Sequence, residues 1–258
     1  MRTVTATRYV TPLREGGSLP AVVEADDDGM YVLKFRGAGQ GPKALIAELV
    51  AGELARAVGL PVPEIVLVNL DAELARTEPD PEIQDLIRAS AGINVALDYL
   101  PGAVTFDALA ERPAAELASA IVWHDAFVTN VDRTPRNTNM LVWHRRLWLI
   151  DHGAALYFHH DWPAAAGQIE TPFPRIRDHV LLPFATRLEE ADAALTARLT
   201  PEVIAATIAL IPDDWLGREA LFASPTEHRA AYEGYLRRRL AAPHAFVKEA
   251  VSARTAHV

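Results

Sequence analysis

The chain has 258 residues, of which 50% are hydrophobic and 23% charged, a composition typical of a globular protein with a sizeable core. Its net charge of −9 would repel phosphate backbones, so we expect no direct nucleic-acid partner. Cysteine is absent, which excludes disulfides, thiolate zinc sites and thiol nucleophiles and favours a cytoplasmic location. The clearest uncharged apolar run in the C-terminal half, residues 203–211, is far shorter than the roughly 20 residues of a membrane span, and the N-terminus lacks the apolar core of a secretory signal. We therefore expect no membrane partner.

The first hundred residues predict five strands and one helix. The predicted strands are residues 8–13, 21–25, 30–35, 64–70 and 93–97. Alternation in the third strand places Tyr31, Leu33 and Phe35 on one face and Val32 and Lys34 on the other. The helix begins at Pro42 and runs to about residue 58, where a Gly-Leu-Pro sequence follows. The polar residues 71–90 are expected to form a mobile stretch.

The remainder of the chain is mainly helical by its apolar periodicity. Residues 97–102 read as a linker. Helices are predicted at residues 114–128, 188–198, 201–211, 226–241 and 243–253, with a short strand pair at 140–143 and 147–150. We therefore expect an α+β fold of two lobes: residues 1–98 form a five-stranded N-lobe with one helix, and residues 99–258 form a larger helical C-lobe.

The most informative motif is a loop that carries Asp132 and Asn137, followed fourteen residues later by Asp151. Phosphoryl transfer needs a carboxylate to orient the attacking hydroxyl and hard oxygen ligands to hold magnesium. The loop and the predicted strand pair after it supply both, in an Asp-x₄-Asn arrangement followed by Asp-x-Gly. A solvated turn rich in Asp and Asn is the plainer alternative, but Asp151 at this interval favours the site.

Lys34 lies in the middle of an apolar strand, although only three of the 25 cationic residues are lysines. An ammonium group in such surroundings needs an anionic partner, and Glu48 on the following helix is the candidate. The alternative is a lysine that extends to solvent along an exposed strand face. Lys43 is the rival cation, but its position at the start of the helix predicts exposure.

Two glycine-rich segments fit a phosphate cradle built from backbone N–H groups. Gly16, Gly17 and Ser18 lie between the first two strands, and residues 37–41 open the helix. The topology favours the first segment. Either one also fits a plain turn.

Histidine provides the competing chemistry. The pair His124-Asp125 fits a metal phosphohydrolase, but His124 is the first histidine in the chain and that class needs another histidine ligand upstream. His159, His160 and Asp161 form a second candidate metal cluster, placed by the pattern in a loop. The Gly-x-Ser-x-Gly elbow of serine hydrolases is absent.

With these motifs, residues 12–160 resemble a HipA-type kinase, a family that contains the serine/threonine kinase toxins of bacterial toxin–antitoxin pairs. The resemblance rests on the Gly-Gly-Ser segment, the Lys34 strand, Glu48, the run of residues 54–64, and the Asp132 loop with Asp151. It implies a protein-kinase-like bilobal fold, and it implies ATP and Mg²⁺ as the cofactors. Family members often carry histidine two residues after the catalytic aspartate, where this chain has Thr134. We therefore expect a short, kinase-only relative, without the extra N-terminal subdomain of the full-length toxins.

The resemblance assigns roles residue by residue. Asp132 would be the catalytic base, and Asn137 and Asp151 the magnesium ligands. Lys34 would bind the nucleotide phosphates with Glu48 as its partner. Gly16, Gly17 and Ser18 would form the phosphate loop, and residues 97–100, including Asp98 and Leu100, the hinge that contacts adenine.

Two classes of function remain open from the sequence. The first is a kinase that phosphorylates a hydroxyl, either of a protein or of a small molecule in the manner of aminoglycoside phosphotransferases. The second is a nucleotide-binding pseudokinase that acts as a regulatory module. The presence of every expected catalytic side chain favours the first.

Overall fold

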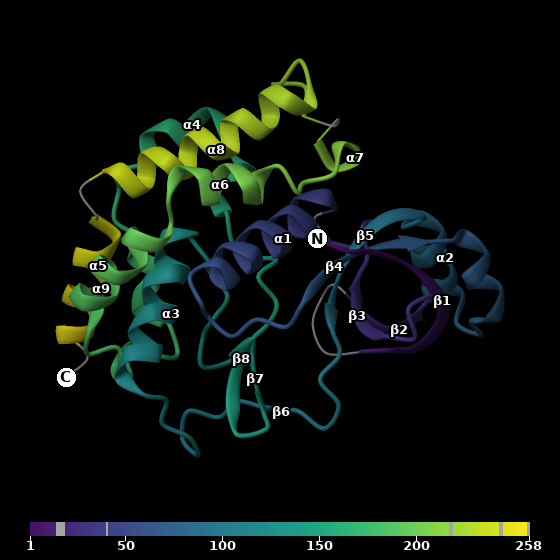
Figure 1. Cartoon of the computed structure of the whole chain (residues 1–258), viewed down its shortest axis with the longest axis horizontal. Coiled ribbons are helices and arrows are strands. Elements are labelled where there is room, and N and C mark those ends of the chain that lie inside the picture. Colours follow the sequence, from purple (N-terminus) through teal and green to yellow (C-terminus); the bar gives the residue numbers. More distant parts are fainter. Residues whose placement is uncertain (14–18, 40, 217–218, 243–244, 257–258) are drawn as a thin grey trace.

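The computed structural model describes residues 1–13, 19–39, 41–216, 219–242 and 245–256. The predicted phosphate loop of Gly16, Gly17 and Ser18 lies outside the described residues. Figure 1 shows a barrel of strands on one side, a group of helices on the other, and helix α1 between them.

The N-terminal part is a closed five-stranded barrel. Its strands are β1 (Thr3–Pro12), β2 (Ala21–Ala25), β3 (Met30–Lys34), β4 (Ile65–Leu70) and β5 (Gly92–Asp98), in the order β1-β2-β3-β5-β4. All five predicted strands are present. Strand β1 begins five residues earlier than the prediction, because its first residues pair in parallel with β4 and thereby close the barrel. The interior of the barrel is apolar and includes Tyr31, Leu33 and Phe35, as the alternation predicted.

Helix α1 (Pro42–Ala57) is buried along most of its length, from Leu45 to Ala55. It packs against β4 and β5 on one side and against α6 and α7 on the other. Gly59, at φ 87°, supplies the left-handed residue that ends the helix. Helix α1 shares its core with the C-terminal helices, whereas the barrel has a core of its own. The division of the chain into two lobes at residue 98 stays a prediction.

Residues 71–90 are not the mobile stretch that we expected. They contain a 3₁₀ helix (Ala72–Thr77) and helix α2 (Pro81–Ala89). Asp80 caps α2 through the backbone N–H of Glu82, and Ile83 and Ile87 are buried against the barrel. The i, i+4 spacing of these two isoleucines is a helical signal that the polar composition concealed.

The C-terminal part is built around helices. A small sheet contains β6 (Val104–Thr105), β7 (Met140–Trp143) and β8 (Arg146–Leu149). The helices are α3 (Ala115–Phe127), α4 (Trp162–Gln168), α5 (Leu188–Arg198), α6 (Pro201–Ile208), α7 (Asp213–Leu216), α8 (Pro225–Ala241) and α9 (Ala245–Ala256). The five predicted helices and the strand pair are present, whereas the short α4 and α7 were missed. In the described part of the chain, no helix is long and apolar enough to cross a membrane.

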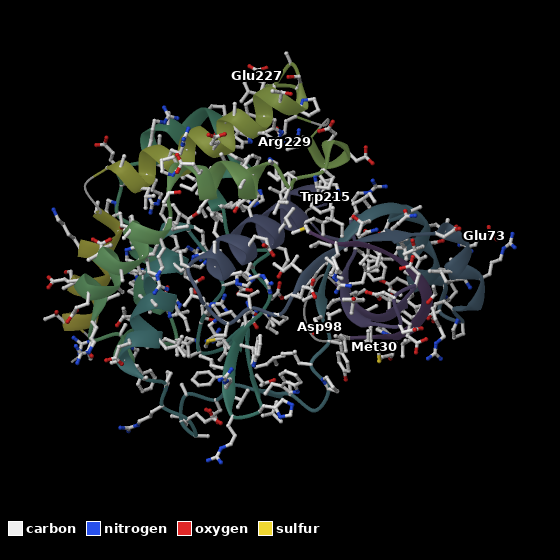
Figure 2. The ribbon with its side chains drawn as sticks, viewed as in Figure 1. Met30, Glu73, Asp98, Trp215, Glu227 and Arg229 are labelled. Atoms are coloured by element: carbon white, nitrogen blue, oxygen red, sulfur yellow. The ribbon has the colours of Figure 1, made fainter. Side chains whose placement is uncertain are left out.

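The two parts are joined by specific contacts. Trp215 on α7 donates its indole N–H to the carbonyl of Ile93 in β5 at 3.0 Å, and Figure 2 shows it where the helices approach the barrel. The backbone N–H of Leu149 in β8 donates to Pro61, just beyond α1, at 2.7 Å. These bonds fix the barrel and α1 relative to the strand pair that precedes Asp151.

Candidate active site

A cleft of about 1430 Å³ lies between the barrel and the helical part. It is lined by Val32 and Lys34 of β3, by the segment that follows β5, by the loop before β7 and by Asp151 after β8. The predicted alternation in β3 is confirmed, because the face opposite the barrel core points into this cleft. Residues from distant parts of the sequence therefore meet at one cavity.

The ammonium group of Lys34 lies between two carboxylates. Its Nζ is 2.7 Å from Oδ1 of Asp151 and 4.0 Å from Oε2 of Glu48. Burial lowers the pKa of Lys34, but the charges of Glu48 and Asp151 outweigh it, so that the pKa lies above its ordinary value. Lys34 is thus a cation, and its shorter contact is with Asp151 rather than with the predicted partner Glu48.

Glu48 is held from behind by His152. The Glu48 side chain is 1% exposed, and its Oε1 lies 3.4 Å from Nδ1 of His152. Burial raises the pKa of Glu48, whereas Lys34 and His152 lower it, with a net pKa of about 2. Glu48 is therefore ionised at neutral pH. His152 had no predicted role, although its place beside Asp151 was an available signal.

The loop between α3 and β7 builds the site around Asp132. The side-chain amide of Asn137 donates to Oδ2 of Asp132 at 2.8 Å. Asn139, which had no predicted role, donates to the main-chain carbonyl of Asp132 at 3.1 Å and to Oδ2 at 3.4 Å. Reciprocal backbone bonds between Thr134 and Asn137 close the turn. Both amides approach the same carboxylate oxygen of Asp132.

A buried ionic cluster supports this loop from below. Asp125 on α3 accepts from Nε of Arg133 at 2.6 Å, from Nε2 of His179 at 2.9 Å and from the amide of Asn130 at 3.0 Å. The N–H of Leu181 donates to Nδ1 of His179, which assigns the ring proton to Nε2. Burial lowers the pKa of His179, so a neutral imidazole donates to Asp125.

The same cluster determines the charge of Asp125. Burial opposes its ionisation, but Arg133 and His179 hold the pKa of the carboxyl far below its ordinary value. Arg133 also donates to the carbonyls of Asn139 and Ile150. It thus connects the segments that lead to Asn139 and to Asp151.

Several residues of the site have left-handed backbone conformations although they are not glycine. Thr129, Asn139, Asp151 and Leu156 have φ values of 54°, 48°, 54° and 53°. Such conformations cost of order 1–3 kcal/mol each and persist where the surroundings hold them. Two of these residues, Asn139 and Asp151, line the cleft.

The predicted hinge lies at the edge of the cleft. Asp98 and Leu100 both line it, and Figure 2 shows Asp98 at the junction between the barrel and the rest of the chain. The N–H of Asp98 donates to Glu64 at 2.8 Å, and the N–H of Tyr99 donates to Met30 at 3.0 Å. Burial raises the pKa of Asp98.

The competing metal sites lack the geometry they need. Among the residues that the structure describes, no three His, Cys, Asp or Glu side chains converge on a metal position. Asp125 of the His124-Asp125 pair is engaged by Arg133, and His159 is buried with Nδ1 at 3.0 Å from the Tyr232 hydroxyl.

Lys43 is not the exposed lysine that we predicted. Its Nζ donates to the carbonyl of His159 at 2.8 Å and lies 2.5 Å from Oε1 of Glu219. Its side chain is 25% exposed. Lys43 therefore joins α1 to the helical part and takes no place in the cleft.

The barrel, helix α1 and the cleft define a protein-kinase-like fold. A model of the HipA-like kinase family matches residues 7–241, and the chain belongs to that family. No curated protein matches the sequence.

Solved kinase structures resemble the whole chain. One is the proinflammatory kinase CtkA of Helicobacter pylori, at 12% identity and a TM-score of 0.60 over 95% of this chain and 96% of that one. Another is the Golgi casein kinase with Mn and ADP bound, at 12% identity and a TM-score of 0.54 over 100% of this chain and 76% of that one. At these identities the likeness concerns the fold.

Proposed function

We propose that this protein is an ATP- and magnesium-dependent kinase that transfers the γ-phosphate of ATP to a hydroxyl group. The observation that carries the proposal is the meeting of Lys34, Asp151, Asn137 and Asn139 at one cleft, with Asp132 hydrogen-bonded to the two asparagines. A lysine held between two carboxylates, with one of these and an amide loop lining the same open cavity, favours a functional site over a purely structural ion pair.

The site fits a nucleotide with its metal. Magnesium in phosphoryl-transfer sites takes one or two protein carboxylates or amides together with phosphate oxygens, so Asn137 and Asp151 suffice as its ligands. When bound, magnesium offsets the negative charge of the phosphates. Lys34 binds the phosphates, and Glu48 remains ionised behind it. The Golgi casein kinase, a fold relative, was solved with Mn and ADP, which supports this pairing.

Asp132 orients the acceptor and receives its proton. Both asparagine amides donate to Oδ2, which leaves Oδ1 to accept the hydrogen bond of the acceptor hydroxyl. The hydroxyl oxygen then attacks the γ-phosphorus, and the bond between the γ-phosphorus and the bridging oxygen breaks, so that ADP leaves with that oxygen. The hydroxyl proton passes to Asp132. The backbone of residues 97–100 contacts the adenine.

The test is an ATP assay with and without magnesium on the wild type and on Asp132→Asn, which keeps the shape of the side chain. It follows ADP release and transfer of labelled γ-phosphate, with casein and the protein itself as protein acceptors and an aminoglycoside panel as small-molecule acceptors. We expect Asp132→Asn to bind ATP normally and to lose about 10²- to 10⁴-fold in turnover. Asp85→Asn, at an aspartate 80% exposed on α2, is the matched control.

Each result decides between the two classes of function. Turnover that falls in Asp132→Asn and not in the control supports the kinase. If the wild type, Asp132→Asn and the control all bind ATP and none of them turns it over, the result would support the pseudokinase. Failure to bind ATP would overturn both.

A further inference from the structure

A second cavity of about 480 Å³ lies on the side of the β7–β8 hairpin. Its floor is apolar and includes Pro61, Phe106, Leu117 and Leu147. Figure 1 shows the hairpin and the segment that leads into α3 close together at the lower edge of the molecule. Phe106 lines this cavity and the catalytic cleft alike, so one side chain forms a wall between them.

The rim of this cavity is cationic. Arg112 comes from the segment before α3, and Arg145 and Arg146 come from the hairpin. None of the three makes a salt bridge or a side-chain hydrogen bond with any residue that the structure describes, whereas arginines such as Arg133 and Arg187 are paired with carboxylates. The one carboxylate in the lining is Glu111. The chain has a net charge of −9, but the three unpaired guanidinium groups make the charge at the rim of this cavity positive.

The hairpin turn holds Arg145 in a left-handed backbone conformation. His144 and Arg145 have φ values of 48° and 61°, which two-residue hairpin turns usually assign to Asn-Gly. Trp143 stabilises the turn, because its ring lies 4.2 Å from that of His144 and its indole N–H donates to Pro101 at 3.0 Å. Left-handed residues that the surroundings hold in place occur at ligand-binding sites, and here one of them is a cation at the rim of a cavity.

We propose that this cavity is a docking groove for an acidic peptide segment of the protein that the kinase phosphorylates. An apolar floor with a cationic rim complements a segment in which acidic and apolar side chains alternate, and the cavity has the size of a small ligand site. Its shared wall with the catalytic cleft would bring such a segment beside the site of transfer. Nucleic acid is disfavoured, because three arginines would have to overcome the repulsion of an acidic chain. The inference rests on the proposed function and names its class of substrate.

The test is fluorescence anisotropy with a labelled peptide in which glutamate and leucine alternate, without ATP. Its control is the same peptide with lysine in place of glutamate. We expect the full chain to bind the acidic peptide and the double variant Arg145→Glu with Arg146→Glu to raise its Kd at least about tenfold. Arg175→Glu, at an exposed arginine outside both cavities, should leave the Kd unchanged. Circular dichroism shows whether each variant is folded.

The results separate this inference from the kinase assignment. Equal binding of both peptides, no binding of the acidic one, or an unchanged Kd in the folded double variant would overturn the groove. So would displacement of the peptide by millimolar inorganic phosphate, which would indicate a site for small anions. Peptide binding that depends on Arg145 and Arg146, in a protein that transfers no phosphate, would support the groove as a peptide site and overturn the kinase.

Discussion

The buried pair of Asp125 and Arg133 supports the catalytic loop, and Asp125→Asn should destabilise the protein strongly. Both side chains are 0% exposed, with Nε of Arg133 2.6 Å from Oδ2 of Asp125. At an effective dielectric constant of about 20, unit charges about 4 Å apart attract by ~4 kcal/mol. Loss of one member of a buried pair costs roughly 3–5 kcal/mol, and a whole domain is stable by only about 5–15 kcal/mol. We expect a loss of roughly 4 kcal/mol.

Urea unfolding followed by tryptophan fluorescence measures this loss. The control is Arg187→Gln, which breaks an exposed pair between Arg187 and Glu116 whose side chains are 53% and 67% exposed, and which should cost about 1 kcal/mol or less. The double variant Asp125→Leu with Arg133→Met removes both charges and should recover much of the stability that Asp125→Asn loses. A loss below about 1 kcal/mol in Asp125→Asn would refute the reasoning, because Arg133 would then tolerate burial without its partner.

Three further outcomes follow from the site. Glu48→Gln removes the second carboxylate from Lys34, leaves the ammonium held by Asp151, and should raise the KM for ATP about tenfold. Asn139→Ala removes two hydrogen bonds to Asp132 and should lower kcat between about tenfold and a hundredfold. Asn139→Gly should lower kcat equally, but this variant should be about 1 kcal/mol more stable than Asn139→Ala, because residue 139 has a φ of 48°. Burial lowers the pKa of His124 to about 4 in the folded protein. Between pH 6.5 and 4, His124 therefore binds a proton in the unfolded chain but not in the folded protein. Stability should fall by about 2 kcal/mol between pH 7.5 and 5 through this group alone, and His124→Leu should remove that share of the loss in urea unfolding.

Each of these expectations has a result that contradicts it. An unchanged KM for ATP in Glu48→Gln would separate Glu48 from phosphate binding. Full kcat in Asn139→Ala would mean that Asn137 alone holds Asp132. An identical pH dependence of stability in His124→Leu and the wild type would show that the pKa of His124 is the same in the folded and the unfolded chain.

The sequence determined the elements whose signals are local. Alternation in residues 30–35 places Lys34 opposite the barrel core, and the spacing of Asp132, Asn137 and Asp151 put three polar residues on one loop and the strand pair after it. Such patterns are readable because the period of a strand and the length of a tight loop are properties of the backbone. The five barrel strands, the strand pair before Asp151 and six of the helices were predictable for the same reason.

The tertiary structure alone decided which of these side chains meet. His179 lies 54 positions from Asp125 and His152 lies 104 positions from Glu48, and no local pattern pairs residues at such distances. The shorter contact of Lys34 with Asp151, the bonds of Asn139 to Asp132 and the engagement of Lys43 by His159 also depend on how the barrel, α1 and the helices pack. Local periodicity specifies the faces of each element, but burial of charge in the assembled core selects the partners, because a buried charge is tolerated only where an opposite charge or a hydrogen bond reaches it.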